Sequence, residues 1–119
     1  MRYVDGFVIP IPKKNLAAYR TMAKKASHVW KDHGAVEYYE CVGDQLGAMI
    51  GTMPFTRLAK LKKNETVIFS WIVYRSRVHR DRVNAKVMKD PRIAKMMQGK
   101  PPFDVKRMAY GGFKVLVQA

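Results

Sequence analysis

The chain has 119 residues, near the commonest size of a single domain, and 48% of them are hydrophobic. No apolar run approaches the roughly 20 residues of a membrane span, and the N-terminus lacks the pattern of a signal peptide. The lone cysteine, Cys41, excludes an internal disulfide and fits a reducing compartment. We therefore predict one cytoplasmic domain over residues 1–119, with no membrane partner.

The charge is strongly basic, with 23 Lys and Arg against 9 Asp and Glu and a formal net charge of +14. Such a surface attracts RNA or DNA without sequence preference. However, the basic residues are spread along the chain, and the sequence has no ribonucleoprotein signature, GXXG loop or zinc-ligand spacing. Composition therefore favours solubility and leaves nucleic-acid binding through charge as an alternative.

The first third of the chain changes its hydrophobic period twice. Residues 2–11 alternate as a strand does, whereas residues 13–33 place apolar side chains at steps of three and four, which predicts a helix. Gly34 is a natural C-terminal stop for that helix. Residues 35–42 then predict a second strand with mixed faces.

The rest of the chain predicts further strands and a second helical region. We expect residues 55–61 to form a short strand, because a long structureless loop is uncommon inside a compact domain. Residues 66–74 are β-branched and aromatic throughout and apolar on both faces, so both faces should be covered. A helix over 76–89 is followed by a second short helix capped by Asp90, and by a final strand over 108–117.

This order of elements predicts the α+β, ferredoxin-like βαββαβ fold, with an antiparallel sheet and both helices on one face. The opposite face of the sheet is also apolar and must be buried by something. A second copy of the chain is the simplest partner, and a twofold pair would close the two sheets into a dimeric α/β barrel. We therefore predict a homodimer that forms through the open sheet face.

Several long phrases of the sequence resemble one known family from end to end. They include "YVDGFV", "ETVIFSWIVY" and "YGGFKVLV". On these phrases the chain resembles the YbaA-like family of small bacterial proteins, a domain of unknown function with the dimeric α/β-barrel fold. The resemblance implies the fold and a dimer, but no activity. Related barrels include antibiotic-biosynthesis monooxygenases, haem-degrading oxygenases and muconolactone isomerases, so the fold alone does not assign a reaction.

No histidine suggests a metal site, because none has a carboxylate at ligand spacing, and we predict neither metal nor cofactor. His33 lies near the middle of the apolar stripe of the first helix. A capped or core histidine is the favoured interpretation. The alternative is a general base or haem-contacting group in a pocket between helix and sheet, since histidine titrates near neutral pH.

Two polar residues of the second helix, Arg80 and Asn84, fall on the same side as its inner face, marked by Val83. Polar groups that face a sheet need partners. In the structural alternative Arg80 extends to the helix edge or pairs with a strand carboxylate such as Asp5. In the functional alternative it points into a pocket, where it would suit a carboxylate or enolate oxygen of a substrate. The sequence leaves these two alternatives open.

Asp5 lies on a strand face that is otherwise apolar. Such a carboxylate has either a cationic partner or a raised pKa that suits proton transfer. We expect the salt bridge, and the obvious partner is Arg107, because the two terminal strands lie close together in this fold.

We expect three aromatic residues, Tyr38, Trp71 and Tyr110, to belong to the hydrophobic core. They are also candidate ligand contacts, because related cofactor-free oxygenases use aromatic-lined cavities. Next to Tyr110 stand Gly111 and Gly112, which we interpret as a bulge or bend that lets the last strand coil toward a partner subunit.

The favoured function is a dimeric small-molecule binding protein. Whether the protein is an enzyme stays open. The candidate activity is cofactor-independent and monooxygenase- or isomerase-like, with an aromatic or enolisable metabolite as substrate. This hypothesis predicts a closed cavity between sheet and helices that reaches Arg80, Asn84 or His33. The alternatives are a nucleic-acid binder that acts through charge and a purely structural dimer.

Overall fold

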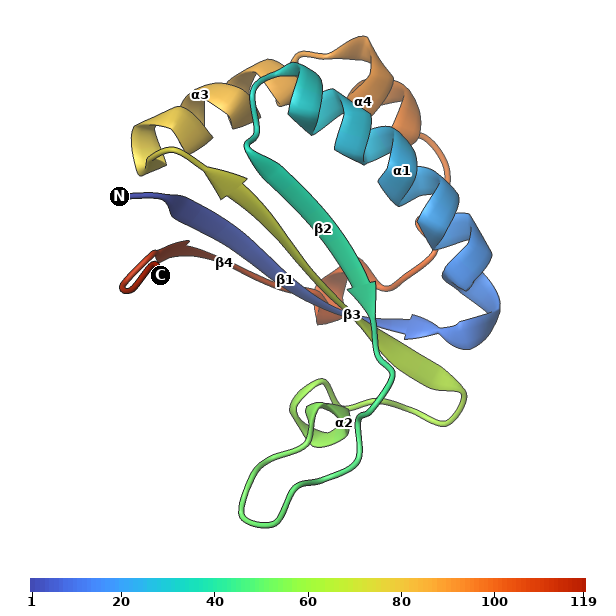
Figure 1. Ribbon diagram of the computed structural model, residues 1–119. Coiled ribbons are helices and arrows are strands. Elements are labelled where there is room, and N and C mark those ends of the chain that lie inside the picture. Colours follow the sequence, from blue (N-terminus) through green and yellow to red (C-terminus); the bar gives the residue numbers. More distant parts are fainter.

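The computed structural model describes residues 1–119 as one antiparallel sheet with helices packed on one face (Figure 1). The strands lie in the order β2-β3-β1-β4. They are β1 (Tyr3–Pro12), β2 (Glu37–Val42), β3 (Glu65–Tyr74) and β4 (Ala109–Lys114). The helices are α1 (Leu16–Asp32), α2 (Phe55–Leu58), α3 (Arg77–Met88) and α4 (Pro91–Met96), with 3-10 turns η1 (Lys13–Asn15) and η2 (Val105–Arg107). The predicted α+β class with an antiparallel sheet is confirmed.

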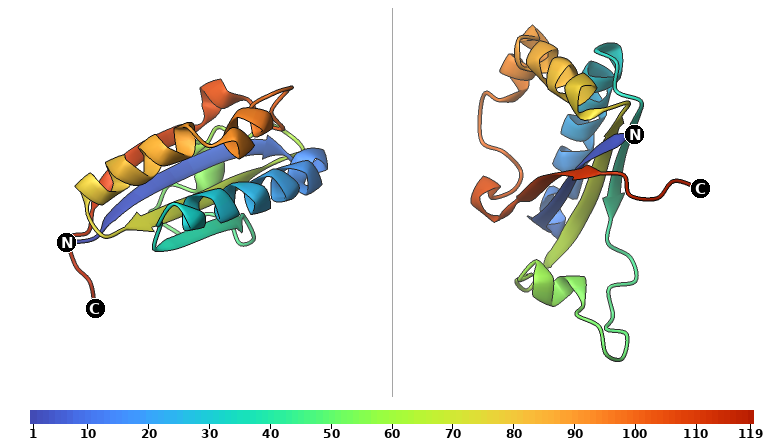
Figure 2. Two further views of the ribbon diagram at one scale, coloured as in Figure 1. Left: turned by 90° about the horizontal axis from the view of Figure 1, so that it is seen from above. Right: turned by 90° about the vertical axis from the view of Figure 1, so that its left-hand side faces the viewer.

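Helices α1, α3 and α4 all lie over the same face of the sheet, whereas the short α2 lies below its end (Figures 1 and 2). Strand β3 occupies the middle, paired with β1 over its whole length and with β2 from Ile68 to Val73. Its side chains that point to the helices are buried, including Ile72 and Tyr74. On the other face Phe69 remains 45% exposed. Val67 and Val73 on the same side as Phe69 are buried, so the chain by itself covers the helix-facing side of β3 fully and the opposite side only in part.

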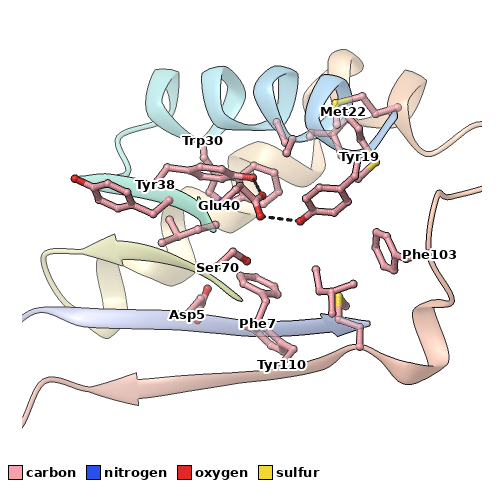
Figure 3. A pocket seen from close by; sticks show the side chains of 18 of the residues that line it. Asp5, Phe7, Tyr19, Met22, Trp30, Tyr38, Glu40, Ser70, Phe103 and Tyr110 are labelled. Atoms are coloured by element: carbon pink, nitrogen blue, oxygen red, sulfur yellow. Dashed lines mark hydrogen bonds between the residues drawn. The ribbon is translucent and has the colours of Figure 1, made fainter. Parts of the chain in front are cut away.

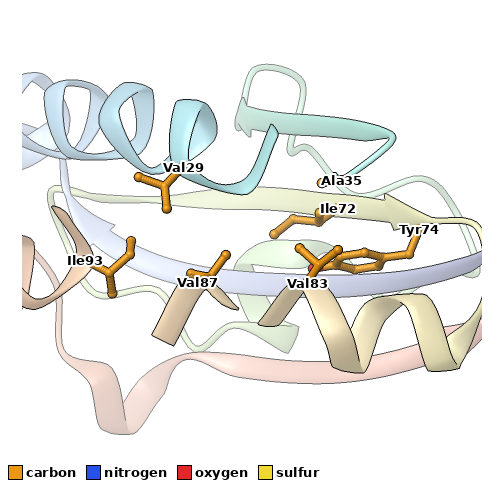
Figure 4. Close-up of a cluster of buried hydrophobic side chains, with 7 residues drawn as sticks. All are labelled: Val29, Ala35, Ile72, Tyr74, Val83, Val87 and Ile93. Carbon is orange, nitrogen blue, oxygen red and sulfur yellow. The ribbon is translucent and has the colours of Figure 1, made fainter. Parts of the chain in front are cut away.

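Two groups of buried side chains hold the helices on the sheet. The first joins α1, α3, α4 and β3, and consists of Val29, Ala35, Ile72, Tyr74, Val83, Val87 and Ile93 (Figure 4). The second joins β1, β3 and α1, and consists of Ile9, Ile11, Tyr19, Ala23 and Ile68. Phe7 packs against both groups and is only partly buried itself. The space between the two groups is where the candidate site lies.

The predicted helix boundaries are confirmed by their capping contacts. The Ser76 hydroxyl accepts a hydrogen bond from the backbone N–H of His79 at 3.0 Å. The Asp90 carboxylate caps α4 in the same way, with Pro91 at its first position. Gly34 follows α1 with a φ of 109°, a conformation that glycine adopts without strain.

The expected strand over residues 55–61 is wrong. This segment contains the helix α2, and the backbone N–H groups of Arg57 and Leu58 both donate to the carbonyl of Pro54. Both edges of β3 are already paired with β1 and β2, so no edge of that strand remains for it. Instead α2 places Phe55 against Phe69, with 6.0 Å between the ring centroids.

Candidate functional site

A cavity of about 570 Å³ lies between the helix-covered face of the sheet and a layer formed by α1, α3, α4 and residues 97–108, which we call the strap (Figure 3). Its walls are mostly aromatic and aliphatic. The residues that line it are Asp5, Phe7, Ile9, Tyr19, Met22, Ala23, Ala26, Trp30, Tyr38, Tyr39, Glu40, Ser70, Ile72, Asn84, Met88, Ile93, Met96, Met97, Phe103, Met108 and Tyr110. A cavity between sheet and helices is thus present as predicted, but it is partly open to solvent rather than closed.

The sequence creates this space by placing small side chains where α1 faces the sheet. Ala23 and Ala26 stand at helical spacing on its buried side, and both line the cavity. Long, flexible methionines from α3, α4 and the strap form the opposite wall. The thioether side chain of methionine adapts to irregular spaces, so this wall suits ligands of more than one shape.

The first polar cluster of the cavity is centred on Asp5, which is only 1% exposed. The Arg80 Nη1 donates to Asp5 Oδ1 at 2.6 Å, and Asn84 Nδ2 donates to Asp5 Oδ2 at 3.5 Å. The same guanidinium donates to the Tyr110 hydroxyl at 3.1 Å and lies 4.9 Å from the centre of the Tyr3 ring. Arg80 therefore compensates the buried charge of Asp5, one of its two predicted roles.

Asn84 is fixed by three partners. Its Oδ1 accepts hydrogen bonds from Trp30 Nε1 at 3.1 Å and from the Tyr74 hydroxyl at 3.2 Å, while its amide nitrogen contacts Asp5. Burial raises the pKa of Tyr74, and the negative charge of Asp5 adds to the effect. The Tyr74 hydroxyl therefore stays protonated as a donor, and this end of the cavity is a rigid, satisfied network.

The second polar cluster is centred on Glu40 of β2 (Figure 3). The Tyr19 hydroxyl donates to Glu40 Oε1 at 2.7 Å, and the Tyr38 hydroxyl donates to Glu40 Oε2 at 2.8 Å. Burial raises the pKa of both tyrosines, and the negative charge of Glu40 raises it further. Unlike Asp5, Glu40 forms no salt bridge with any Lys, Arg or His side chain.

Four of the predicted site residues therefore meet at one cavity. Asp5, Tyr38, Asn84 and Tyr110 all line it. Arg80 does not line the cavity but contacts it indirectly, through Asp5. The cavity reaches Asn84, as predicted.

Two other candidates lie elsewhere. Trp71 points to the open face of the sheet, where it stacks on Tyr39 with 5.1 Å between the ring centroids. His33 stands just after α1 and contacts Asp90 at the start of α4 through Nε2, at 2.8 Å. His33 thus joins two helix ends outside the cavity, which agrees with the capped alternative.

The expected ion pair between Asp5 and Arg107 is wrong. Arg107 lies in η2, where its two terminal nitrogens donate to Glu65 at 2.7 and 2.9 Å. The residue precedes β4 rather than belonging to it, so it faces the start of β3 and not the interior of β1. Helix α3 supplies the partner of Asp5 instead.

Of the predicted bulge or bend at Gly111 and Gly112, the bulge is wrong, because β1 and β4 pair in unbroken register from Tyr3–Lys114 to Val8–Ala109, and the bend toward a partner stays a prediction. The Tyr3 ring covers Gly112, and a Cβ there would stand 2.9 Å from Tyr3 Cε2. The glycine therefore makes room for an aromatic side chain that in turn supports Arg80.

Glu40, Tyr19 and Phe103 are site residues that sequence reasoning missed. Alternation along β2 puts Glu40 on the same face as Tyr38, and this signal was present in the sequence. The contribution of the strap, including Phe103, has no periodic signal.

In the structure no group of three or more His, Cys, Asp and Glu side chains lies close enough to hold a metal, and no helix combines the length and apolar character that crossing a membrane requires.

Comparison with known proteins places the chain in a family. Residues 2–105 match the family described as "Protein of unknown function (DUF1428)". The chain belongs to this family. It is 43% identical over 118 residues to the uncharacterized protein YbaA of Escherichia coli and to that of Shigella flexneri, with 98% of each chain covered. The resemblance to the YbaA-like family is thus confirmed, and these names give the DUF1428 protein no activity.

Among solved structures, the DUF1428 chain is similar to one titled "De novo designed protein Foldit4". The TM-score is 0.50 and the identity 10%, over 97% of this chain and 99% of that one. At this identity the likeness concerns the fold alone.

Proposed function

We propose that this protein binds a small, largely apolar molecule in the cavity beneath α1, α3 and α4. The observation that carries the proposal is the cavity itself, whose volume of about 570 Å³ falls in the range of small-molecule sites, roughly 300–1,000 Å³. Apolar walls with a few converging polar groups are the common design of such sites. Here the polar groups are Asp5 with Asn84 at one position and Glu40 at another.

The strap supports this function because it covers the cavity while being attached at few points. Asn15 Nδ2 donates to the carbonyl oxygen of Pro102 at 2.8 Å, and the Phe103 ring contacts Tyr19 edge-on at 5.8 Å. Opening this segment for a ligand would release these contacts and the packing of Phe103 and Met108 on the second core group, whereas no strap residue packs on the first core group.

An enzymatic role is an extension of the same proposal. An aromatic or enolisable metabolite would fit the aromatic walls. Proton transfer would fall to Glu40, since Asp5 is already paired with Arg80. The predicted monooxygenase- or isomerase-like activity depends first on ligand binding, which is therefore the property to test.

Filling the cavity tests the proposal directly. Ala26 lines the cavity and Ala18 is exposed on the same helix, so Ala26→Phe and Ala18→Phe are a matched pair. Nile red, a neutral apolar dye, should bind the unaltered protein and the Ala18→Phe variant equally. Its fluorescence should be lost in the Ala26→Phe variant. Native mass spectrometry of the unaltered protein should show a co-purified small molecule. Equal dye binding by all three proteins would contradict the proposal.

We also propose that two copies associate through the open face of the sheet to complete a dimeric barrel. Aromatic rings gather on that face, where Tyr39 is 48% and Phe113 is 59% exposed, and Phe69 contacts both Trp71 and Phe55. A continuous exposed apolar patch on a soluble protein is typical of an interface. A second copy presents the same apolar patch and can cover this one, and sedimentation velocity measures the association. Nucleic-acid binding through net charge stays a prediction from composition.

A further inference from the structure

We propose that the cavity selects ligands that carry a positive charge, namely hydrophobic amines, and that Glu40 receives the ammonium group. This inference rests on the proposed binding function and specifies its ligand class. It follows from three properties of the cavity: the sign of its charge, the free acceptor capacity of Glu40 and the aromatic rings around it.

The cavity has the opposite charge to the rest of the molecule. The chain carries 23 Lys and Arg against 9 Asp and Glu, yet the residues that line the cavity include Asp5 and Glu40 and no Lys, Arg or His. A pocket meant for a carboxylate, phosphate or enolate would use one of the many available cations. Their absence from the walls disfavours anionic ligands.

Only one of the two carboxylates is available to a ligand. Asp5 is paired with Arg80 at 2.6 Å and is 1% exposed, so its charge is compensated from within the protein. Glu40 has no basic side chain within salt-bridge distance of 4.0 Å. Glu40 is partly buried, so water screens its charge less than at the surface, and a bound cation would supply the missing partner.

Glu40 also retains capacity to accept hydrogen bonds. Tyr19 donates to one carboxylate oxygen and Tyr38 to the other, which leaves a second lone pair on each oxygen. Both phenols serve as donors that hold the carboxylate in place. Arg20 and Lys24 line a separate groove on the outer side of Glu40, but neither forms an ion pair with it.

The rings near Glu40 add a second attraction for a cation. Trp30 and Tyr38 stand 6.2 Å apart between ring centroids, and Tyr19 and Phe103 stand 5.8 Å apart. The faces of aromatic rings carry negative charge density and attract ammonium groups. The methionine wall then takes the apolar body of the ligand. A carboxylate inside an aromatic enclosure is the arrangement that favours an amine over an uncharged molecule of the same shape.

Three ligands of matched shape test the inference: 4-phenylbutylamine, 4-phenylbutanol and 4-phenylbutyrate, each competing with Nile red at neutral pH. A hydrogen bond between charged groups is stronger than one to a neutral hydroxyl, so the amine should bind at least about tenfold more tightly than the alcohol. The butyrate should bind more weakly than the alcohol.

The Glu40→Gln variant should bind amine and alcohol equally, and its Nile red fluorescence reports whether the cavity is intact. Glu37→Gln is the control, because Glu37 is on the same strand but points to the other face, where it pairs with Arg2. That variant should keep the full preference for the amine.

Equal affinities of the unaltered protein for amine and alcohol would overturn the amine proposal. If Nile red still bound, the binding function itself would stand. A preference that survives Glu40→Gln would remove Glu40 from its assigned role. Failure of Nile red and all three ligands to bind would overturn the proposed function and this inference together. The comparison in the unaltered protein decides the ligand class even if Glu40→Gln does not fold.

Discussion

Asp5 is the least exposed charged side chain of the protein, and its surroundings determine what it can do. Arg80 and Asn84 occupy its two oxygens, and Tyr3 stacks under the guanidinium. A buried charge held by this many partners is fixed in place rather than reactive. We therefore assign Asp5 to the structure of the cavity wall and the proposed ligand contact to Glu40.

Removing the guanidinium should be costly. The Arg80→Met variant leaves Asp5 buried without a counter-ion, which typically destabilises a protein by about 3–5 kcal/mol. Adding Asp5→Asn should recover part of this loss, because no buried charge then remains. Urea unfolding of the unaltered protein, both single variants and the double variant measures the coupling.

The control for this cycle is Arg82→Met, which removes an exposed arginine of the same helix and should change the free energy of unfolding by less than about 0.5 kcal/mol. Strictly additive effects of the Asp5 and Arg80 substitutions would contradict the assignment of this pair.

At the residue scale, the sequence identified unusual polar residues but not their partners. Periodicity assigns a residue to a face of a helix or strand, and this was enough to single out Asp5, Arg80 and Asn84. Which side chains then meet depends on how α3 is placed on the sheet, a tertiary property. Arg107 was therefore matched to the wrong carboxylate, and Glu40 went unnoticed among the polar residues of β2.

At the element scale, the strands and long helices could be predicted because each has one period and clear ends. The segment over 55–61 could not, because its short apolar pattern fits a strand and a helical turn equally well. The last strand ends at Lys114 rather than Val117, and the chain beyond it runs away from the sheet (Figure 2). The strap has no hydrophobic period, so its place over the cavity follows from tertiary contacts such as those of Pro102 and Phe103.

The ion pair between Glu65 and Arg107 attaches η2, at the end of the strap, to the start of β3. Hydrogen bonds from Arg107 lower the pKa of Glu65 from 4.5 to about 2. Because the folded state lowers this pKa, the pair stabilises the fold above about pH 4.5, and the contribution is lost as the pH falls toward 2. We expect Glu65→Gln to destabilise the protein at neutral pH, and the difference to shrink over that window.

Urea unfolding of the two proteins at pH 7, 4, 3 and 2.5 checks this expectation. A difference in free energy of unfolding that stays constant over the series would show that Glu65 acts through packing and not through its charge.

At the scale of the whole molecule, the two faces of the sheet have different surroundings. One face is closed by three helices and holds a cavity without basic residues, while Lys and Arg remain outside it. The other face presents Tyr39, Phe69, Trp71 and Phe113 with no helix over its centre. The sequence of β3 is apolar on both faces, which is typical of a strand that is covered on both sides. This chain covers the helix-facing side fully and the other side only in part.

Association through the open face should therefore depend on Phe69, which lies at the centre of the aromatic patch and is 45% exposed. Phe69→Asp would place an unpaired charge inside the interface, where burial without a partner is strongly unfavourable. Because the side chain is half exposed in the single chain, the variant should fold and sediment as a monomer at micromolar concentration.

The unaltered protein should sediment as a dimer under the same conditions, and so should Val78→Asp. Val78 is 61% exposed on α3, on the helix side of the sheet, so that variant introduces the same charge away from the patch. A monomeric unaltered protein, or a Phe69→Asp variant that remains dimeric, would exclude the open sheet face as the dimer interface. Loss of the dimer in Phe69→Asp alone, with Nile red still bound, would separate the interface from the cavity on the other side of the sheet.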